Sequence, residues 1–268
     1  MTEFTVFGFT SILNRLLPEP HAGLLAGLLF GTKASLPRDL YDALVVTGTL
    51  HIIALSGQNI SIMEDLIGKV LLPIVGKWWA SLLTIGVVIW FVWFVGFSPS
   101  IVRAAIMGSM SLIAVLFGRQ YWAILSWTIT VGIMLIINAR WLTDISFQLS
   151  ALATLGIILF GNKKESVGHR GIWHMLSDDL RLTLSAQVFT IPLILFSFHR
   201  LSLVSPLSNL AIGWVIAPVT MMGWLTIFVG YISLYAGQIF AWIDWVLLEY
   251  IIRTIQIVSR IPFASIGW

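Results

Sequence analysis

One long apolar run of this chain, residues 44–72, is interrupted by glycine and polar residues. The interruption covers residues 48–59 and reads Gly-Thr-Leu-His-Ile-Ile-Ala-Leu-Ser-Gly-Gln-Asn. At membrane depth every backbone N–H and C=O needs a partner, so a polar or non-helical segment persists there only where protein or a water-filled cavity surrounds it. We therefore expect a helix break or re-entrant turn over residues 56–59 that faces an internal polar cavity.

Composition indicates that the apolar runs belong in a membrane. Hydrophobic residues make up 58% of the 268 residues and charged residues 10%, whereas a soluble domain carries roughly 25% charged residues. A water-soluble globule is excluded. The formal net charge of +3 fits basic cytoplasmic loops as well as an anionic partner. The chain has no cysteine, which excludes a disulfide framework, a thiolate nucleophile and a Cys-ligated metal.

The apolar runs predict an all-α, polytopic integral membrane protein with about seven to nine transmembrane helices. Residues 24–30 and 251–258 are too short to cross alone, so we also expect one or two broken or re-entrant half-helices. A short apolar or interfacial segment over residues 1–20 should precede a transmembrane domain over residues 21–268. Residues 161–179 are predicted to form a polar loop, and the positive-inside rule places it in the cytoplasm. The clear spans are 79–97, 101–117, 121–137, 145–160, 182–198, 204–229 and 231–248.

Four ordered segments carry a recognisable pattern. Residues 47–61 read Thr-Gly-Thr-Leu-His-Ile-Ile-Ala-Leu-Ser-Gly-Gln-Asn-Ile-Ser, and residues 96–104 read Gly-Phe-Ser-Pro-Ser-Ile-Val-Arg-Ala. Residues 147–150 read Phe-Gln-Leu-Ser, and residues 187–209 contain Gln187, Pro192, Phe198, Arg200 and the pair Ser208-Asn209. Taken together, the four segments resemble the ComEC family of competence proteins. The similarity runs from about Gly23 to the Pro262-Phe263-Ala264 tail.

The resemblance implies a channel that carries single-stranded DNA across the bacterial cytoplasmic membrane during natural transformation, in contact with membrane lipids. It covers the competence transmembrane domain, residues 21–268, without the OB-like and metallo-β-lactamase-like domains of the family. A His-x-His-x-Asp-His cluster and a Gly-x-x-x-x-Gly-Lys-Ser/Thr loop are missing from the sequence. We therefore expect no enzymatic activity and no cofactor, and we expect a separate helicase-like ATPase and nuclease as partners. A homo-oligomer is left open.

A path for single-stranded DNA needs polar or positive groups for the phosphates and a wall that tolerates any base. Arg103 stands inside a predicted span, where an unpaired arginine costs about 2.5–3.5 kcal/mol. We expect it to point inward, near Gln148 or the break, although snorkelling to the interface is the alternative. The candidates for the DNA path or polar cavity are His51, Ser56, Gly57, Gln58, Asn59, Arg103, Gln148, Ser150, Gln187 and Asn209.

Structural roles compete with a path role at several of these positions. The break could offer free N–H groups to a phosphate, or it could be a polar kink buried for packing. Gln148, Gln187 and Asn209 could line a path or hydrogen-bond between helices. His51 has no His or carboxylate three or four residues later, so we expect no metal site there. It is a hydrogen-bonded core residue or has a path or proton role.

Two other functions fit parts of the sequence. Residues 54–57, Ala-Leu-Ser-Gly, are similar to the Gly-x-Ser-Gly of rhomboid proteases, with Ser56 as nucleophile and His199 as base. The leading glycine of that motif is missing here. A small-solute or lipid transporter also needs a polar break in a membrane helix. The four ordered motifs favour the DNA channel over both alternatives.

Overall fold

The computed structural model describes residues 5–32, 36–53, 57–161, 172–198 and 200–267. Ser56, His199 and most of the predicted 161–179 loop lie outside these residues. The described part is almost entirely helical, which confirms the all-α class, and its strands form one short antiparallel pair. In order the elements are α1 (Val6–Leu16), α2 (His21–Phe30), α3 (Arg38–Val46), η1 (Leu50–Ile52), α4 (Gly57–Val95), α5 (Pro99–Leu116), α6 (Ala123–Ile137), η2 (Ala139–Thr143), α7 (Ile145–Gly156), η3 (Ile157–Gly161), α8 (Ile172–Phe198), β1 (Arg200–Ser202), α9 (Ser205–Ile232), α10 (Leu234–Ser259) and β2 (Ser265–Gly267).

The long helices fall on the predicted apolar runs. In the described part of the chain, four helical segments are long and apolar enough to cross a membrane, and three more helices are apolar but shorter. The predicted total of about seven to nine crossings stays a prediction. The four long segments are Gly57–Val95, Pro99–Leu116, Leu180–Ser197 and Ser205–Ile232.

Two predicted boundaries are wrong. α8 already begins at Ile172, so residues 172–179 are helical and do not belong to a loop that continues to Asp179. Residues 172–176 are mostly apolar in the sequence and extend the helical pattern of the predicted span toward its N-terminal side. Residues 251–258 are not a separate half-helix, because α10 runs without interruption through Glu249 and Tyr250.

α4 consists of two helical arms. Its backbone leaves the helical region at Gly76, where φ is 76° and ψ is 169°. Such a positive φ is adopted readily by glycine. The first arm begins at Gly57 beside Arg103, near the start of α5, whereas Trp78 of the second arm meets Phe117 just after α5 with ring centroids 5.8 Å apart. The first arm therefore runs parallel to α5 and the second runs antiparallel to it.

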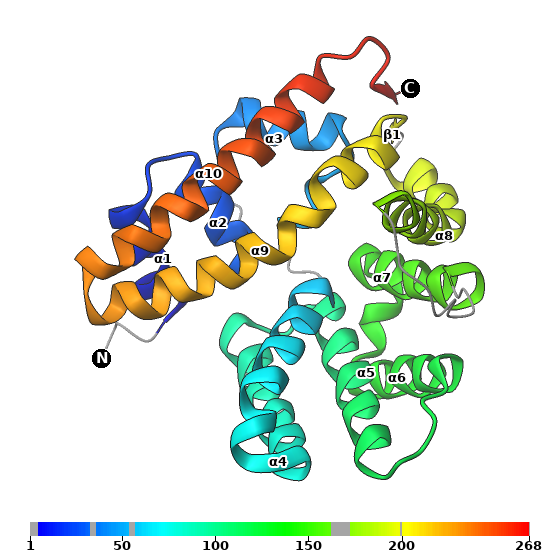
Figure 1. Cartoon of the computed structure of the whole chain (residues 1–268). Helices are drawn as coiled ribbons and strands as arrows, with labels where there is room; N and C mark the ends of the chain where they lie inside the picture. The colour runs from blue at the N-terminus through cyan, green and yellow to red at the C-terminus, as the bar shows by residue number, and fades with distance from the viewer. Residues whose placement is uncertain (1–4, 33–35, 54–56, 162–171, 199, 268) are drawn as a thin grey trace.

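The helices form two groups, each with its own hydrophobic core (Figure 1). One group contains α1, α2, α3, α9 and α10, and the other contains α4, α5, α6 and α7, with α8 packed on α7. Trp224 of α9 lies where the groups meet. Its ring is in edge contact with Phe30 of α2 at 5.6 Å and with Phe91 of α4 at 5.7 Å. Aromatic packing thus joins the two cores.

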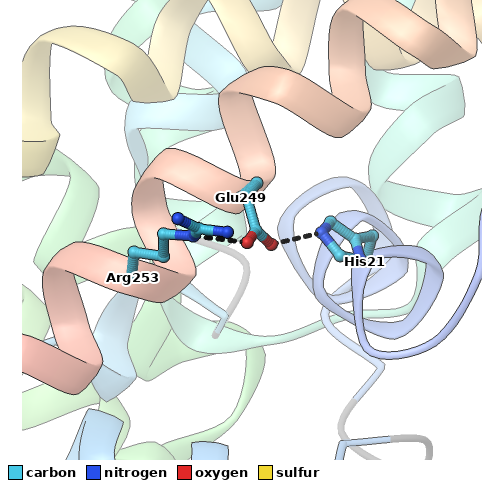
Figure 2. A network of polar contacts seen from close by, with 3 residues as sticks. All are labelled: His21, Glu249 and Arg253. Carbon is cyan, nitrogen blue, oxygen red and sulfur yellow. Dashed lines mark hydrogen bonds and ion pairs between the residues drawn. The ribbon is translucent and has the colours of Figure 1, made fainter.

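A polar network ties α2 to α10 within the first group (Figure 2). The carboxylate of Glu249 accepts a hydrogen bond from Arg253 Nε at 2.6 Å and lies 2.9 Å from His21 Nε2. The bond from Arg253, with help from His21, lowers the pKa of Glu249. The buried ring of His21 also stacks on Trp245, with centroids 5.3 Å apart. The start of α2 is therefore fixed to the C-terminal half of α10.

Asn59 forms a polar link between the two groups. Its amide Nδ2 donates to the carbonyl of Leu28 at 2.6 Å, and the residue is only 5% exposed. Leu28 lies in the last turn of α2, where carbonyls have no partner within the helix. Asn59, in the first turn of α4, therefore satisfies a carbonyl at the C-terminal end of α2.

This link predicts different effects of two neighbouring substitutions. Asn59→Leu should lower the free energy of unfolding by about 1–3 kcal/mol, because the buried Leu28 carbonyl loses its donor. Gln58→Leu should change it by less than about 0.5 kcal/mol, since Gln58 is exposed. Thermal unfolding of the purified variants in one detergent measures both. Equal losses from the two variants would contradict the role assigned to Asn59.

Candidate functional site

The break before α4 begins with a glycine cap on α3. Gly48 has φ of +70°, its N–H bonds to the carbonyl of Val45 at 3.1 Å, and the N–H of Thr49 bonds to the carbonyl of Leu44 at 2.9 Å. These two bonds form a Schellman motif, which satisfies helix-end carbonyls and favours glycine at this position. The hydroxyl groups of Thr47 and Thr49 lie 2.8 Å apart and are fully buried. The Thr-Gly-Thr sequence therefore ends α3 with its polar groups paired.

Ser205, at the start of α9, gathers polar residues around Gly48. Its hydroxyl oxygen accepts long hydrogen bonds from Gln187 Nε2 of α8 at 3.4 Å and from Asn209 Nδ2 at 3.5 Å. A Cβ on Gly48 would lie 2.8 Å from the Cβ of Ser205 and 3.0 Å from that of Ser202. The glycine thus permits close approach of the α9 start as well as the positive φ. Gln187 and Asn209, two candidates from the segment 187–209, therefore lie near Gly48 of the segment 47–61.

Arg103 lies at the other end of the break. Its Nε donates to Ser150 Oγ of α7 at 2.8 Å, and a Cβ on Gly57 would lie 3.0 Å from its Nη2. About one turn earlier on α5 and α7, the hydroxyl groups of Ser100 and Ser146 lie 3.2 Å apart. Arg103 of the segment 96–104 and Ser150 of the segment 147–150 therefore lie close to Gly57 of the segment 47–61, at the start of α4. This agrees with the predicted position of Arg103 beside the break.

The charge around Arg103 is unbalanced within the described residues. The guanidinium is half-buried, and the ion pairs of that part of the chain join other residues. Its neighbour Gly57 begins a helix, whose N-terminal end carries a partial positive charge. Two positive groups thus lie together without a carboxylate, an arrangement that attracts an anion.

The break differs in extent from the prediction. Gly57, Gln58 and Asn59 lie in the first described turn of α4, so the predicted break does not extend over them, and Ser56 lies outside the described residues. Polar residues are suited to a first turn because its N–H groups have no partner within the helix. Gln58 is exposed, while Asn59 is buried in a structural contact with α2. The cavity expected here stays a prediction, as does any role of Ser56.

Gln148 and His51 have local partners. Gln148 Nε2 donates to the carbonyl of Leu142 at 2.8 Å, so Ser150, not Gln148, is the α7 residue that binds Arg103. The exposed ring of His51 lies with Nδ1 3.1 Å from the carbonyl of Gly48. Among the described residues, no group of three or more His, Asp or Glu side chains could hold a metal ion.

We define the polar junction as the set of residues gathered at the two ends of the break. Sequence reasoning missed Ser205, which joins Gln187, Asn209 and Gly48. A signal was available, because Ser205-Pro206 places a proline at the first turn of a helix, a common helix start. The members of the polar junction are Gly48, His51, Gly57, Arg103, Ser150, Gln187, Ser205 and Asn209.

Comparison with known proteins identifies the family to which this chain belongs. The chain is 24% identical over 265 residues to ComE operon protein 3 of Bacillus subtilis (strain 168), which covers 96% of this chain and 33% of that protein. It is 24% identical over 212 residues to the uncharacterized protein YcaI of Escherichia coli (strain K12), covering 75% of this chain and 28% of that protein. The chain thus spans about a third or less of these curated relatives, and no solved structure matches it. The model of the Competence family, described as "Competence protein", matches residues 28–268, and together with the apolar helices it shows that this chain is a membrane protein that belongs to the Competence family.

Proposed function

We propose that this chain provides the path along which single-stranded DNA crosses the bacterial cytoplasmic membrane during natural transformation. Membership of the Competence family and similarity to ComE operon protein 3 support a role in DNA uptake. The four long apolar helices support a multi-pass arrangement. The matched part is a third or less of each relative, so the activity of a whole relative is carried over to this chain as part of the proposal.

The position of Arg103 carries the proposal. Arg103 is half-buried, is held by Ser150 through Nε and lies next to the positive end of α4 at Gly57. DNA presents one phosphate at every nucleotide, so a cation in the path binds it regardless of sequence. The remaining guanidinium N–H groups make no hydrogen bond to a described residue. They are therefore positioned to donate to a passing phosphate.

The uncharged part of the polar junction supports the same function. Gln187 and Asn209 share one weak acceptor, Ser205 Oγ, at 3.4 and 3.5 Å. Amide groups held by such long bonds can exchange them for bonds to a phosphate or a base edge at low cost. A path that combines one cation with neutral donors binds a strand weakly enough for it to move on.

The proposal includes partners for this chain. Membrane lipids surround its exposed apolar helices, and a separate helicase-like ATPase supplies the energy, since the sequence has no Gly-x-x-x-x-Gly-Lys-Ser/Thr loop. A separate nuclease prepares the single strand. Several copies of the chain could assemble around one path as a homo-oligomer.

Substitution of Arg103 tests the path role. Arg103→Gln should lower DNA uptake about tenfold or more, because a charge-assisted hydrogen bond of about 1.5–3 kcal/mol is lost. Arg103→Lys should retain part of the uptake, since the charge remains without the planar geometry. The measurement is entry of labelled DNA into a transformable strain whose own protein is deleted, at matched membrane abundance.

Arg119→Gln is the matched control, because Arg119 is an exposed arginine just beyond α5. It should leave uptake unchanged. Equal uptake by wild type and Arg103→Gln would refute the path role. Unchanged DNA entry, together with a lost import of a small solute or lipid, would favour the transporter alternative.

A second pair of variants separates the channel from a rhomboid-like hydrolase. Gly57→Leu should abolish uptake, since a side chain there meets Arg103 and Ala104 within 3.2 Å. Ser56→Ala should have a mild effect, because a channel does not use the hydroxyl as a nucleophile. Gly86→Leu controls for helix glycines, as nothing lies within 4 Å of a Cβ there. Loss of function from Ser56→Ala, together with labelling of Ser56 by a serine-directed probe, would support the hydrolase instead.

A further inference from the structure

The first arm of α4 runs parallel to α5 and packs against it. At two levels of this contact a charged side chain of one helix lies against a glycine of the other. At the first level Arg103 lies against Gly57, and two helical turns further the carboxyl group of Glu64 lies against Gly108. A Cβ on Gly108 would collide with both carboxyl oxygens of Glu64. We call this contact between the first arm of α4 and α5 the α4–α5 seam. Glycine at each level leaves room for a charged side chain.

The carboxyl group of Glu64 has no counter-charge inside the seam. Its Oε1 is buried and has no hydrogen-bond partner among the described residues. Its neighbour Asp65 is different, because it is exposed and pairs with Lys69 at 2.6 Å. Glu64 is therefore the acid of this arm that points into the protein without a cation.

Few titratable or charged groups lie on the helices that pack most extensively against α4, which are α2, α5 and α9. α5 contributes only Arg103, which is five residues before Gly108, lies beside Gly57 and is bound to Ser150. The group on α2 is His21, which is already bound to Glu249. The rest are Tyr231 at the end of α9, and Asp65, Lys69 and Lys77 on α4 itself.

The surroundings of the Glu64 carboxyl group then determine whether it is ionised or protonated. Removing an ionised carboxylate from water without a cation or hydrogen-bond donors costs several kcal/mol, so such a group takes up a proton instead. Within membrane proteins, unpaired acids of this kind serve in proton pathways. From the burial of Oε1, the missing partner and the contact with Gly108, we propose that Glu64 is a proton-binding site of the α4–α5 seam.

The site also links proton release to movement of the seam. Ionisation of Glu64 becomes favourable when water or a cation reaches the buried Oε1, and opening of the seam gives that access. Arg103 occupies the same seam, so a phosphate that draws Arg103 away from Gly57 favours the open form. By thermodynamic linkage, proton release then favours phosphate binding equally. This second step rests on the proposed function, whereas the proton-binding site does not.

Carbodiimide labelling tests the site without any DNA. The hydrophobic reagent dicyclohexylcarbodiimide modifies protonated carboxyl groups in apolar surroundings, and an ordinary glutamate is almost fully ionised at about pH 7. In membranes containing the protein, Glu64 should be labelled at least about tenfold more than Asp65 or Glu249 at about pH 7, as quantified by peptide mass spectrometry. Glu64→Gln should remove the label from that peptide. Equal labelling of the three carboxyl groups, or none at Glu64 at any pH, would overturn the proton-binding site.

DNA uptake tests the linkage separately. Glu64→Gln keeps the size of the side chain and stays neutral, so it should fold normally and reduce uptake at least about fivefold. Unchanged uptake with Glu64 labelled in the wild type would overturn the linkage and leave the proton-binding site standing. If the wild-type protein itself carries no DNA, the proposed function fails and the labelling alone still decides the proton-binding site.

Discussion

Backbone groups between α3 and α4 need hydrogen-bond partners inside the protein, and the surrounding structure is arranged around that need. The Schellman cap at Gly48 closes α3, and the fully buried Thr47 and Thr49 pair their hydroxyl groups. On the other side of the break, Asn59 reaches across to the last turn of α2. The close approach of Ser205 to Gly48 ties the start of α9 to the end of α3, and the bond from Asn59 to Leu28 ties the start of α4 to α2. The two helical groups therefore meet at the break.

The residues around the break also leave an unbalanced positive charge at Arg103 and at the start of α4. Arg103 is anchored by Ser150, with the positive end of α4 beside it and no carboxylate among the described residues to balance either. In a protein interior a charge interacts more strongly than in water, so this imbalance acts on any anion that enters. Gln187 and Asn209, gathered on Ser205, add neutral donors on the α8 and α9 side. The proposed DNA path uses this combination of one cation and neutral donors.

Local sequence patterns predicted the helices and the break, but not the partners across them. Apolar runs placed α5, α6 and α9 close to their observed bounds, and the polar interruption located the break before α4. The cost of a polar group at membrane depth indicated that Arg103 belongs near Gln148 or the break, yet Ser150 and not Gln148 is its partner. Ser150 and Gln148 are two residues apart on one helix and so face different neighbours, and only tertiary packing decides which one meets Arg103. The pair Ser205-Pro206 indicated a helix start, but the contacts of Ser205 with α8 and α3 depend on tertiary packing.

The α4–α5 seam depends on glycine more than on ion pairing. At Gly57 and Gly108 a missing side chain leaves room for the guanidinium of Arg103 and the carboxyl of Glu64 against the neighbouring helix. A conventional interface would pair such groups directly, and a buried pair of that kind is hard to separate because each partner would be left uncompensated. Separating them by two helical turns, each on its own glycine, keeps the cation available to an anion and the acid available to a proton. The seam can then open at a smaller electrostatic cost than a buried ion pair would impose.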